Sequence, residues 1–273
     1  MPVRSDELNP EQRAAVTHVG GPLLVVAGAG SVKTLTLACR VAELVHRGVR
    51  PERILLLTFT RRAAREMLAR AERMIGGRVG GKVWGGTFHA LGNRLLRLYG
   101  RAIGISPDFT VLDQTDAADL LDLIRNDMGL GSGKRRFPRK DTLGAIYSRT
   151  VNAGEKLAIV LRGDFPWCEK EVEPIRSIFR AYVERKRAQN VLDYDDLLLY
   201  WNALMQTVAS LFEHVLVDEY QDTNALQADI LAGLAKGTKN ITVVGDDAQP
   251  STRSGAPRFA TSWSSPTDSP ALA

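Results

Sequence analysis

The chain has 273 residues, 44% of them hydrophobic and 25% charged, a composition typical of a globular protein with one large domain or two modest ones. Its two cysteines, Cys39 and Cys168, lack metal-ligand spacing, which argues against a disulfide scaffold and favours a reducing compartment. The net charge of +5 is compatible with a polyanionic partner. No apolar stretch reaches the roughly 18 to 20 residues that span a bilayer, so we expect a cytoplasmic protein without a membrane partner.

A phosphate-binding loop is indicated after the first predicted strand. Residues 23–26 are the apolar run Leu-Leu-Val-Val, and apolar residues recur at helical spacing from residue 37 to residue 45. Between them, residues 27–34 read Ala-Gly-Ala-Gly-Ser-Val-Lys-Thr, and Lys-Thr at the start of a helix is typical of a Walker A motif. In such a loop the backbone N–H groups surround phosphate oxygens, the lysine reaches the β- and γ-phosphates, and the threonine hydroxyl binds Mg²⁺. The predicted nucleotide-binding residues are Gly28, Ala29, Gly30, Ser31, Val32, Lys33 and Thr34.

One residue of this loop departs from the Walker A pattern. The pattern has glycine directly before the lysine, where this chain has Val32. A β-branched side chain is stiff, and here it stands where the backbone and a phosphate should nearly touch. The sequence therefore predicts an ATP site and leaves open whether this copy of the site binds ATP.

Apolar strands and amphipathic helices alternate through much of the chain. After the first strand, further strands are predicted at residues 54–59, 83–88, 214–219 and 241–246. Near-continuous apolar strands that alternate with helices indicate an α/β fold with a parallel sheet covered on both faces.

A mainly helical segment, residues 104–190, interrupts this alternation. We therefore expect an α/β domain made of residues 1–103 and 191–249, with residues 104–190 inserted as a helical subdomain. Within the insertion, five of the seven residues 134–140 are basic. We interpret them as a solvated loop, with contacts to nucleic-acid phosphates as the alternative.

The last 24 residues, 250–273, differ in composition from the rest. Thirteen of the 24 are Ser, Thr or Pro, and three are charged. Such a segment buries too little apolar surface to offset the entropy lost on ordering, so we predict that it is disordered.

Two further segments carry side chains suited to nucleotide chemistry. The apolar strand at 215–217 is followed by Asp218 and Glu219, the Walker B arrangement. The first carboxylate can hold Mg²⁺ through water, and the second can polarise the water that attacks a phosphate. Near the N-terminus, Gln12 offers the paired donor and acceptor that suit an adenine edge.

Taken together, these segments resemble the UvrD/Rep/PcrA-type superfamily 1 DNA helicases. The motifs follow in the family's order: the Q motif at 8–12, motif I at 27–34, motif Ia at 58–67, motif Ib at 86–90, a family segment at 192–198, motif II at 218–224 and the opening of motif III at 244–249. The resemblance covers residues 6–249. It implies a RecA-like P-loop NTPase sheet, ATP and Mg²⁺ as cofactors, single-stranded DNA as a partner, and 3′–5′ translocation driven by ATP hydrolysis.

The resemblance also assigns roles to individual residues. Gln12 would contact adenine, Thr34 and Asp218 would hold Mg²⁺, Glu219 would be the catalytic base, and Gln249 would sense the γ-phosphate. The residues that it places along the DNA path are Phe59, Thr60, Thr87, Phe88 and His89. The α/β domain would correspond to subdomain 1A and the helical insertion to subdomain 1B.

The chain departs from the family after Gln249. It continues Pro250-Ser251-Thr252-Arg253 where the family has an aromatic residue and an arginine, and the second RecA-like domain is missing. We therefore expect this chain alone not to unwind DNA, unless another protein supplies that domain. Two alternatives remain: a non-catalytic remnant that binds single-stranded DNA or a partner, and a decayed product of a frameshifted gene.

Overall fold

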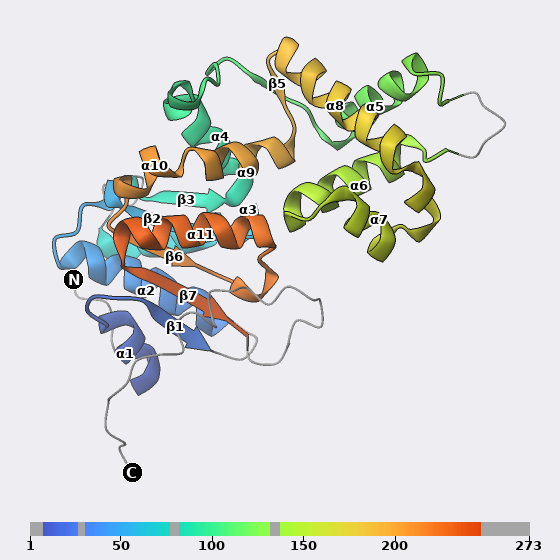
Figure 1. Ribbon diagram of the computed structural model, residues 1–273. Helices are drawn as coiled ribbons and strands as arrows, with labels where there is room; N and C mark the ends of the chain where they lie inside the picture. Colours follow the sequence, from blue (N-terminus) through green and yellow to red (C-terminus); the bar gives the residue numbers. More distant parts are fainter. Residues whose placement is uncertain (1–7, 27–30, 77–81, 132–136, 247–273) are drawn as a thin grey trace. The chain divides into compact units, whose positions relative to one another are not determined.

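A computed structural model describes residues 8–26, 31–76, 82–131 and 137–246, with the backbone alone for Ser31 and Val32 (Figure 1). The chain divides into two compact units, Met1–Leu91 with Met205–Ala273, and Gly92–Leu204. The second unit extends beyond the insertion expected at 104–190 because helices on either side of it pack together. A Cβ at Gly92 would lie 2.9 Å from the carbonyl oxygen of Leu197, so those two helices are in close contact.

The first unit is built on a five-stranded parallel sheet with the strand order β1-β7-β6-β2-β3. Its strands are β1 (Leu23–Val26), β2 (Ile54–Thr58), β3 (Trp84–Thr87), β6 (His214–Val217) and β7 (Ile241–Gly245). All five residues of β2 are buried, as expected for a central strand of a parallel sheet covered on both faces. The predicted α/β fold with a parallel sheet is confirmed.

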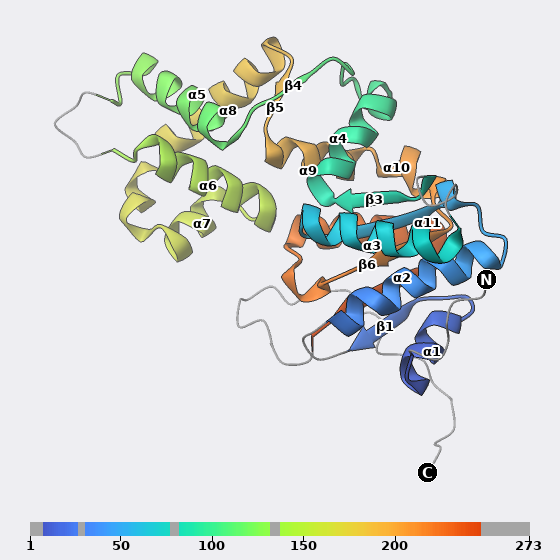
Figure 2. The same ribbon diagram turned by 180° about the vertical axis from the view of Figure 1, so that it is seen from behind.

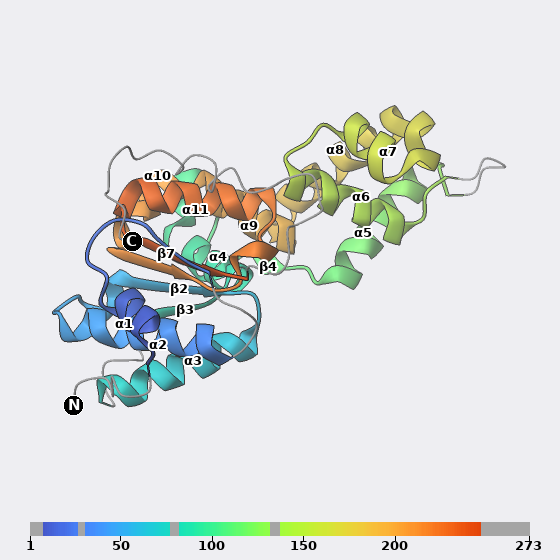
Figure 3. The ribbon, with the colours of Figure 1, turned by 90° about the horizontal axis from the view of Figure 1, so that it is seen from below.

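Helices cover both faces of this sheet (Figures 2 and 3). On one face lie α1 (Pro10–Thr17), α2 (Ser31–His46) and α3 (Arg61–Ile75), and on the other lie α10 (Met205–Val208) and α11 (Ala225–Thr238). Apolar residues of α2 and α3 pack against the sheet in one core. Its fully buried members include Leu37, Val41, Ile54, Leu56, Met67, Leu216 and Val244.

The helix that carries Gln12 is held by a buried arginine. Arg40 of α2 donates from Nη1 to the carbonyl oxygens of Ala15 (2.8 Å) and His18 (3.2 Å), and from Nε to Oγ1 of Thr242 (2.9 Å). Burial lowers the pKa of Arg40 to about 10. The guanidinium thus fastens the end of α1 to α2 and to β7 through neutral acceptors.

The second unit is mainly helical, as predicted for the insertion. After α4 (Phe88–Tyr99), which begins in the first unit, it contains α5 (Gln114–Asp127), α6 (Lys140–Ala153), α7 (Leu157–Asp164), α8 (Val172–Ala188) and α9 (Tyr194–Ala203). Two short parallel strands, β4 (Thr110–Val111) and β5 (Val191–Leu192), pair where the chain enters and leaves the helices. Its core includes Leu121, Leu143, Ile146, Leu161, Ile175 and Ile178.

A buried lysine joins α8 to the start of α9. Lys186, 2% exposed, donates from Nζ to Oδ2 of Asp193 (2.6 Å) and to Oδ2 of Asp196. Tyr182 donates its hydroxyl to the same Asp193 oxygen (2.8 Å), and the Lys186 ammonium lies 4.4 Å from the Tyr182 ring centroid. The side chain of Asp193 also accepts from the backbone N–H of Asp196, which caps α9. These carboxylates therefore link α8 to the start of α9.

Candidate active site

The residues predicted to act on a nucleotide lie at the carboxyl ends of neighbouring parallel strands. Lys33 lies in the first turn of α2, beyond the end of β1, Asp218 and Glu219 follow β6, and Asp246 follows β7. Because β1, β7 and β6 are adjacent and parallel, these ends meet at one edge of the sheet. That edge is where open α/β sheets bind ligands.

Lys33 is the centre of this group. It is 3% exposed, and its ammonium lies 3.3 Å from Oε2 of Glu219 and 3.5 Å from Oδ2 of Asp246. A buried ammonium requires compensating negative charge, which the two carboxylates provide. The phosphate contact of Lys33 that the sequence suggests stays a prediction, and a bound phosphate would supply the same negative charge.

A glutamine that the sequence analysis did not single out joins the two acidic segments. Gln221 donates from Nε2 to Oε2 of Glu219 (2.5 Å), and its Oε1 accepts from the backbone N–H of Asp246 (3.1 Å). A Cβ at Gly245 would lie 3.3 Å from Oε1, so β7 ends close against this amide. Gln221 thereby fixes the Glu219 carboxylate relative to the segment that leads to Gln249. Its place in motif II was a signal that could have drawn attention to it.

The backbone of Glu219 adopts an uncommon conformation. Its φ of 50° and ψ of 46° lie in the left-handed region, which residues other than glycine occupy at a cost in free energy. The turn directs the carboxylate toward Lys33 and leaves the side chain 40% exposed. Glu219 can therefore reach both the ammonium and a water molecule.

Asp218 is buried beside Glu219 with one oxygen unsatisfied. The residue is 3% exposed, and Oδ1 has no hydrogen-bond partner among the described residues. Burial, and then the neighbouring Glu219 charge, raise the pKa of Asp218 to about 6. A free, buried carboxylate oxygen suits a hard cation such as Mg²⁺. In the described part of the chain, no three His, Cys, Asp or Glu side chains gather as a metal site.

This burial predicts a stability cost at Asp218. The pKa is raised on folding, so the carboxylate destabilises the protein above about pH 6 and does so less as the pH falls through that value. We expect Asp218→Asn to raise the free energy of unfolding at neutral pH by about 1 to 3 kcal/mol. Urea unfolding at neutral and mildly acidic pH measures this change, with Asp229→Asn, which replaces an exposed carboxylate of α11, as the control. A loss of stability, or a gain unaffected by pH, would contradict the assignment.

Gln12 is engaged in the start of α1. Its Oε1 accepts from the backbone N–H of Asn9 (2.9 Å), while Oδ1 of Asn9 accepts from the backbone N–H of Gln12 (2.8 Å). This reciprocal capping box orients the side chain. The amide acceptor is therefore used in the cap, and the Nε2 group is the part of Gln12 suited to an adenine acceptor.

The residues predicted to contact DNA lie at two neighbouring strand ends. Thr58 at the end of β2 pairs with Thr87 at the end of β3, so Phe59 and Thr60 come beside Phe88 and His89. The rings of Phe59 and Phe88 have their centroids 5.8 Å apart. The sheet thus brings together two segments that are 26 residues or more apart in the sequence.

Not every member of this set is available for base stacking. Phe88 is 2% exposed, so its ring supports Phe59 and offers no open face. Oγ1 of Thr60 accepts from the backbone N–H of Ala63 (3.1 Å) and caps α3. Burial lowers the pKa of His89, which favours the neutral ring. Phe59 is half-buried, so it is the aromatic residue of this predicted set whose ring keeps some exposure.

The structure describes the predicted phosphate-binding loop only in part. Thr34 lies half-buried in the first turn of α2, next to Lys33, and Ser31 and Val32 begin that helix. Gly28, Ala29, Gly30 and Gln249 lie outside the described residues, as does the tail 250–273. Within the described residues, none of the helices combines the length and the apolar character needed to cross a bilayer.

Comparison with known proteins agrees with this arrangement of motifs. Residues 8–250 match the family described as the UvrD/REP helicase N-terminal domain. The ATP-dependent DNA helicase UvrD1 of Mycobacterium leprae is 37% identical over 265 residues, and the ATP-dependent DNA helicase PcrA of Leuconostoc citreum is 38% identical over 251 residues. Each match covers 89% of this chain and 33% of the relative, so the chain spans about a third of the length of these relatives.

Proposed function

Since the chain belongs to the UvrD/REP helicase family, we propose that it is the N-terminal, ATP-binding part of a 3′–5′ DNA helicase that couples ATP hydrolysis to translocation on single-stranded DNA. The observation that carries the proposal is the group formed by Lys33, Glu219 and Asp246 at the carboxyl edge of the parallel sheet. Residues 1–103 and 191–249 would be subdomain 1A and residues 104–190 subdomain 1B, with 250–273 as a disordered tail.

The nucleotide roles of individual residues are carried over from the family resemblance. Lys33 would bind the phosphates within the loop 28–34, Gln12 would contact adenine, and Gln249 would sense the γ-phosphate. Thr34 and Asp218 would hold Mg²⁺, which when bound neutralises charge on the phosphate oxygens. Lys33 is paired with Glu219 (3.3 Å), so a phosphate that binds Lys33 would also release that carboxylate.

Glu219 would then act as the base for phosphoryl transfer. Oε2 is held by the Nε2 group of Gln221, and the second oxygen remains to accept a proton from the attacking water. Gln221 also accepts a hydrogen bond from the backbone N–H of Asp246. A shift of Asp246 would therefore change the position of the Glu219 carboxylate through Gln221. We infer that Gln221 positions Glu219 and links it to the region of Gln249.

The isolated chain should not unwind DNA, because stepping requires two domains that close around ATP. A strand-displacement assay with ATP and Mg²⁺ tests this expectation, with Glu219→Gln as the matched control. Unwinding above that control would contradict it. A separate protein that supplies the second RecA-like domain would be expected to restore the activity.

Single-stranded DNA should bind at the ends of β2 and β3. We expect Phe59→Ala to weaken binding of an oligonucleotide by about 1 to 3 kcal/mol, the loss typical of one stacked base. Fluorescence anisotropy at several salt concentrations measures it. Trp167→Ala, which removes a 72% exposed aromatic side chain from the helical unit, is the control. An equal loss in both variants, or none in Phe59→Ala, would remove Phe59 from the DNA path.

A second candidate function is favoured by Val32. If valine prevents ATP binding, the chain would be a non-catalytic remnant that binds single-stranded DNA or a partner protein, or a decayed gene product. The non-catalytic remnant would bind single-stranded DNA with an affinity that depends on salt concentration and does not change when nucleotide is added. A decayed product would bind neither ligand and would aggregate through its exposed apolar surface.

A further inference from the structure

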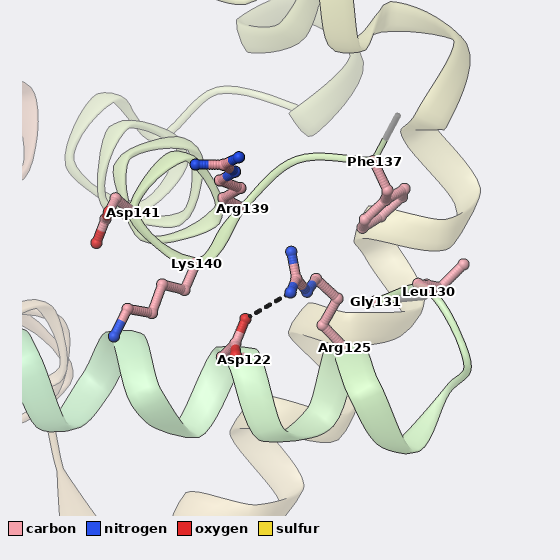
Figure 4. A pocket seen from close by; sticks show the side chains of 8 residues that line it. All are labelled: Asp122, Arg125, Leu130, Gly131, Phe137, Arg139, Lys140 and Asp141. Carbon is pink, nitrogen blue, oxygen red and sulfur yellow. Dashed lines mark ion pairs between the residues drawn. The ribbon is translucent and has the colours of Figure 1, made fainter. Parts of the chain in front are cut away.

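Arg40 of α2 is a buried cation that has no carboxylate partner among the described residues. It is 2% exposed, and its guanidinium donates to backbone carbonyl oxygens and to the hydroxyl of Thr242. Cations elsewhere are matched by carboxylates: beside a cavity of about 440 Å³ in the helical unit, for example, Arg125 pairs with Asp122 at 2.9 Å (Figure 4). Burying a charge among neutral acceptors costs free energy. What Arg40 supplies in return is the fixed direction of its hydrogen bonds.

These hydrogen bonds complete the carboxyl end of α1. The last carbonyl groups of a helix have no partner within the helix, and α1 has no basic residue in its own last turn. Nη1 of Arg40 lies 2.8 Å from the carbonyl oxygen of Ala15. The carbonyl oxygens of Val16 and His18 are each 3.2 Å from the same nitrogen. A cation is favourable at this end of the helix dipole, so Arg40 is a cap that comes from another helix.

Apolar packing also holds α1, but it does not fix the helix in the same way. Leu8, just before α1, and Val16 pack with Cys39 of α2 in a small core. Hydrophobic contact has no preferred direction, so by itself it allows a short helix to slide or turn over its neighbour. The hydrogen bonds of Arg40 have a preferred length and angle. They therefore set both the position of α1 along α2 and its rotation.

Arg40 also connects the two ends of the proposed nucleotide site. Gln12 lies three residues before Ala15, on the same face of α1. Lys33 lies seven residues before Arg40, which is two turns or about 10 Å along the same side of α2. A third contact, from Nε to Oγ1 of Thr242 (2.9 Å), holds the guanidinium to β7. The contacts of Arg40 thus fix Gln12 relative to the ammonium of Lys33.

We propose that Arg40 is a positioning residue that sets the distance between Gln12 and the phosphate site, so that the chain selects adenine nucleotides. The inference rests on the proposed ATP site. Oε1 of Gln12 accepts from the backbone N–H of Asn9, so Nε2 is the donor for an acceptor nitrogen of the base. Base and phosphates belong to one ligand, and Nε2 can meet the base only at the separation that Arg40 maintains. Without Arg40 the phosphates would still bind at Lys33, but the base contact would be weakened.

The test compares Mg-ATP with magnesium tripolyphosphate, which offers the phosphates without the base. Both are titrated calorimetrically into the full chain in the Val32→Gly background. We expect Arg40→Met to lower the affinity for ATP roughly twofold to tenfold, as for one hydrogen bond, and to leave the affinity for tripolyphosphate unchanged. Gln12→Ala should show the same selective loss. The double variant should lose no more than Gln12→Ala alone, because Arg40 acts through Gln12.

Two further variants separate positioning from folding and from charge. Arg40→Lys keeps the charge but lacks the fork that reaches α1 and Thr242 together, so we expect a smaller selective loss. This variant decides the question if Arg40→Met does not fold, as its unfolding transition will show. The matched control is Arg47→Met, which removes an exposed arginine that pairs with Glu43 at 2.7 Å. Arg47→Met should leave both affinities unchanged.

The outcomes distinguish a failure of this inference from a failure of the proposed function. Equal losses of affinity for ATP and tripolyphosphate, or an unchanged ratio of the two in the folded Arg40 variants, would overturn the inference. A further loss in the double variant would overturn it as well. Absence of binding of both ligands by the folded Val32→Gly parent would overturn the proposed ATP site, and the inference with it.

Discussion

Replacing Lys186 with methionine should lower the free energy of unfolding by about 3 to 5 kcal/mol. Methionine fills a similar volume but carries no charge, so Asp193 and Asp196 would remain buried without a cation. Removing one partner of a buried ion pair is strongly destabilising for this reason. Tyr182 would also lose the ammonium that lies 4.4 Å from its ring centroid. Urea unfolding followed by circular dichroism measures the loss.

The pH dependence of this loss separates the electrostatic cause from a packing defect. In the intact cluster, burial and the neighbouring Asp193 charge raise the pKa of Asp196 from 3.8 to about 6. A carboxyl group whose pKa rises on folding destabilises the folded state above that pKa and is relieved as the pH falls through it. The loss in Lys186→Met should therefore shrink between about pH 7 and about pH 5.

The neighbouring Arg185 provides the control for Lys186. Its pair with Asp127 is long (3.5 Å) and the two side chains are 40% and 55% exposed. Arg185→Met should change the free energy of unfolding by less than about 1 kcal/mol, as expected for a surface ion pair. Equal losses in the two variants, or a loss in Lys186→Met that does not depend on pH, would show that the buried network does not hold α8 to α9.

Replacing Lys33 with alanine should remove most of the affinity for Mg-ATP. The test is made in a Val32→Gly background, so that the loop has the glycine of the Walker A pattern. Loss of a buried charge that contacts phosphate is worth about 2 to 5 kcal/mol, which corresponds to a loss of affinity of roughly thirtyfold to several thousandfold. Isothermal titration calorimetry measures the affinity, and the unfolding transition of each variant shows that it is folded.

The control for Lys33 is an exposed lysine of the same unit. Lys82 is 63% exposed and pairs with Glu52 at 3.4 Å. Lys82→Ala changes the net charge by the same amount but should leave the affinity for Mg-ATP nearly unchanged. If Lys33→Ala binds Mg-ATP as tightly as its parent, then the nucleotide does not bind at the edge of the sheet where Lys33 meets Glu219.

The sequence predicted the features that depend on local pattern. Four of the five strands of the sheet are short apolar runs in the sequence, and the order of the motifs located Lys33, Asp218 and Glu219 at strand ends. Parallel pairing then places these residues at one edge, so the candidate site follows from the fold class. The helical character of the insertion was equally visible in its spacing of apolar residues.

Other features depend on tertiary contacts that no local pattern carries. Gln221 meets the backbone of Asp246 only because β6 and β7 are neighbours in the sheet. Phe88 was predicted to line the DNA path, but it is buried, and its ring packs beside that of Phe59. The division of the chain at Gly92 arises from close packing of α4 on α9, which joins segments about a hundred residues apart.

The central claim is that Mg-ATP binds at the carboxyl edge of the sheet around Lys33. Calorimetric titration of Mg-ATP into the chain, and in parallel into its Val32→Gly variant, tests this claim most directly. The account predicts saturable binding by the variant and weaker binding by the chain with valine, because the β-branched side chain stands where a phosphate should approach the backbone. Absence of binding by a folded Val32→Gly variant would contradict it.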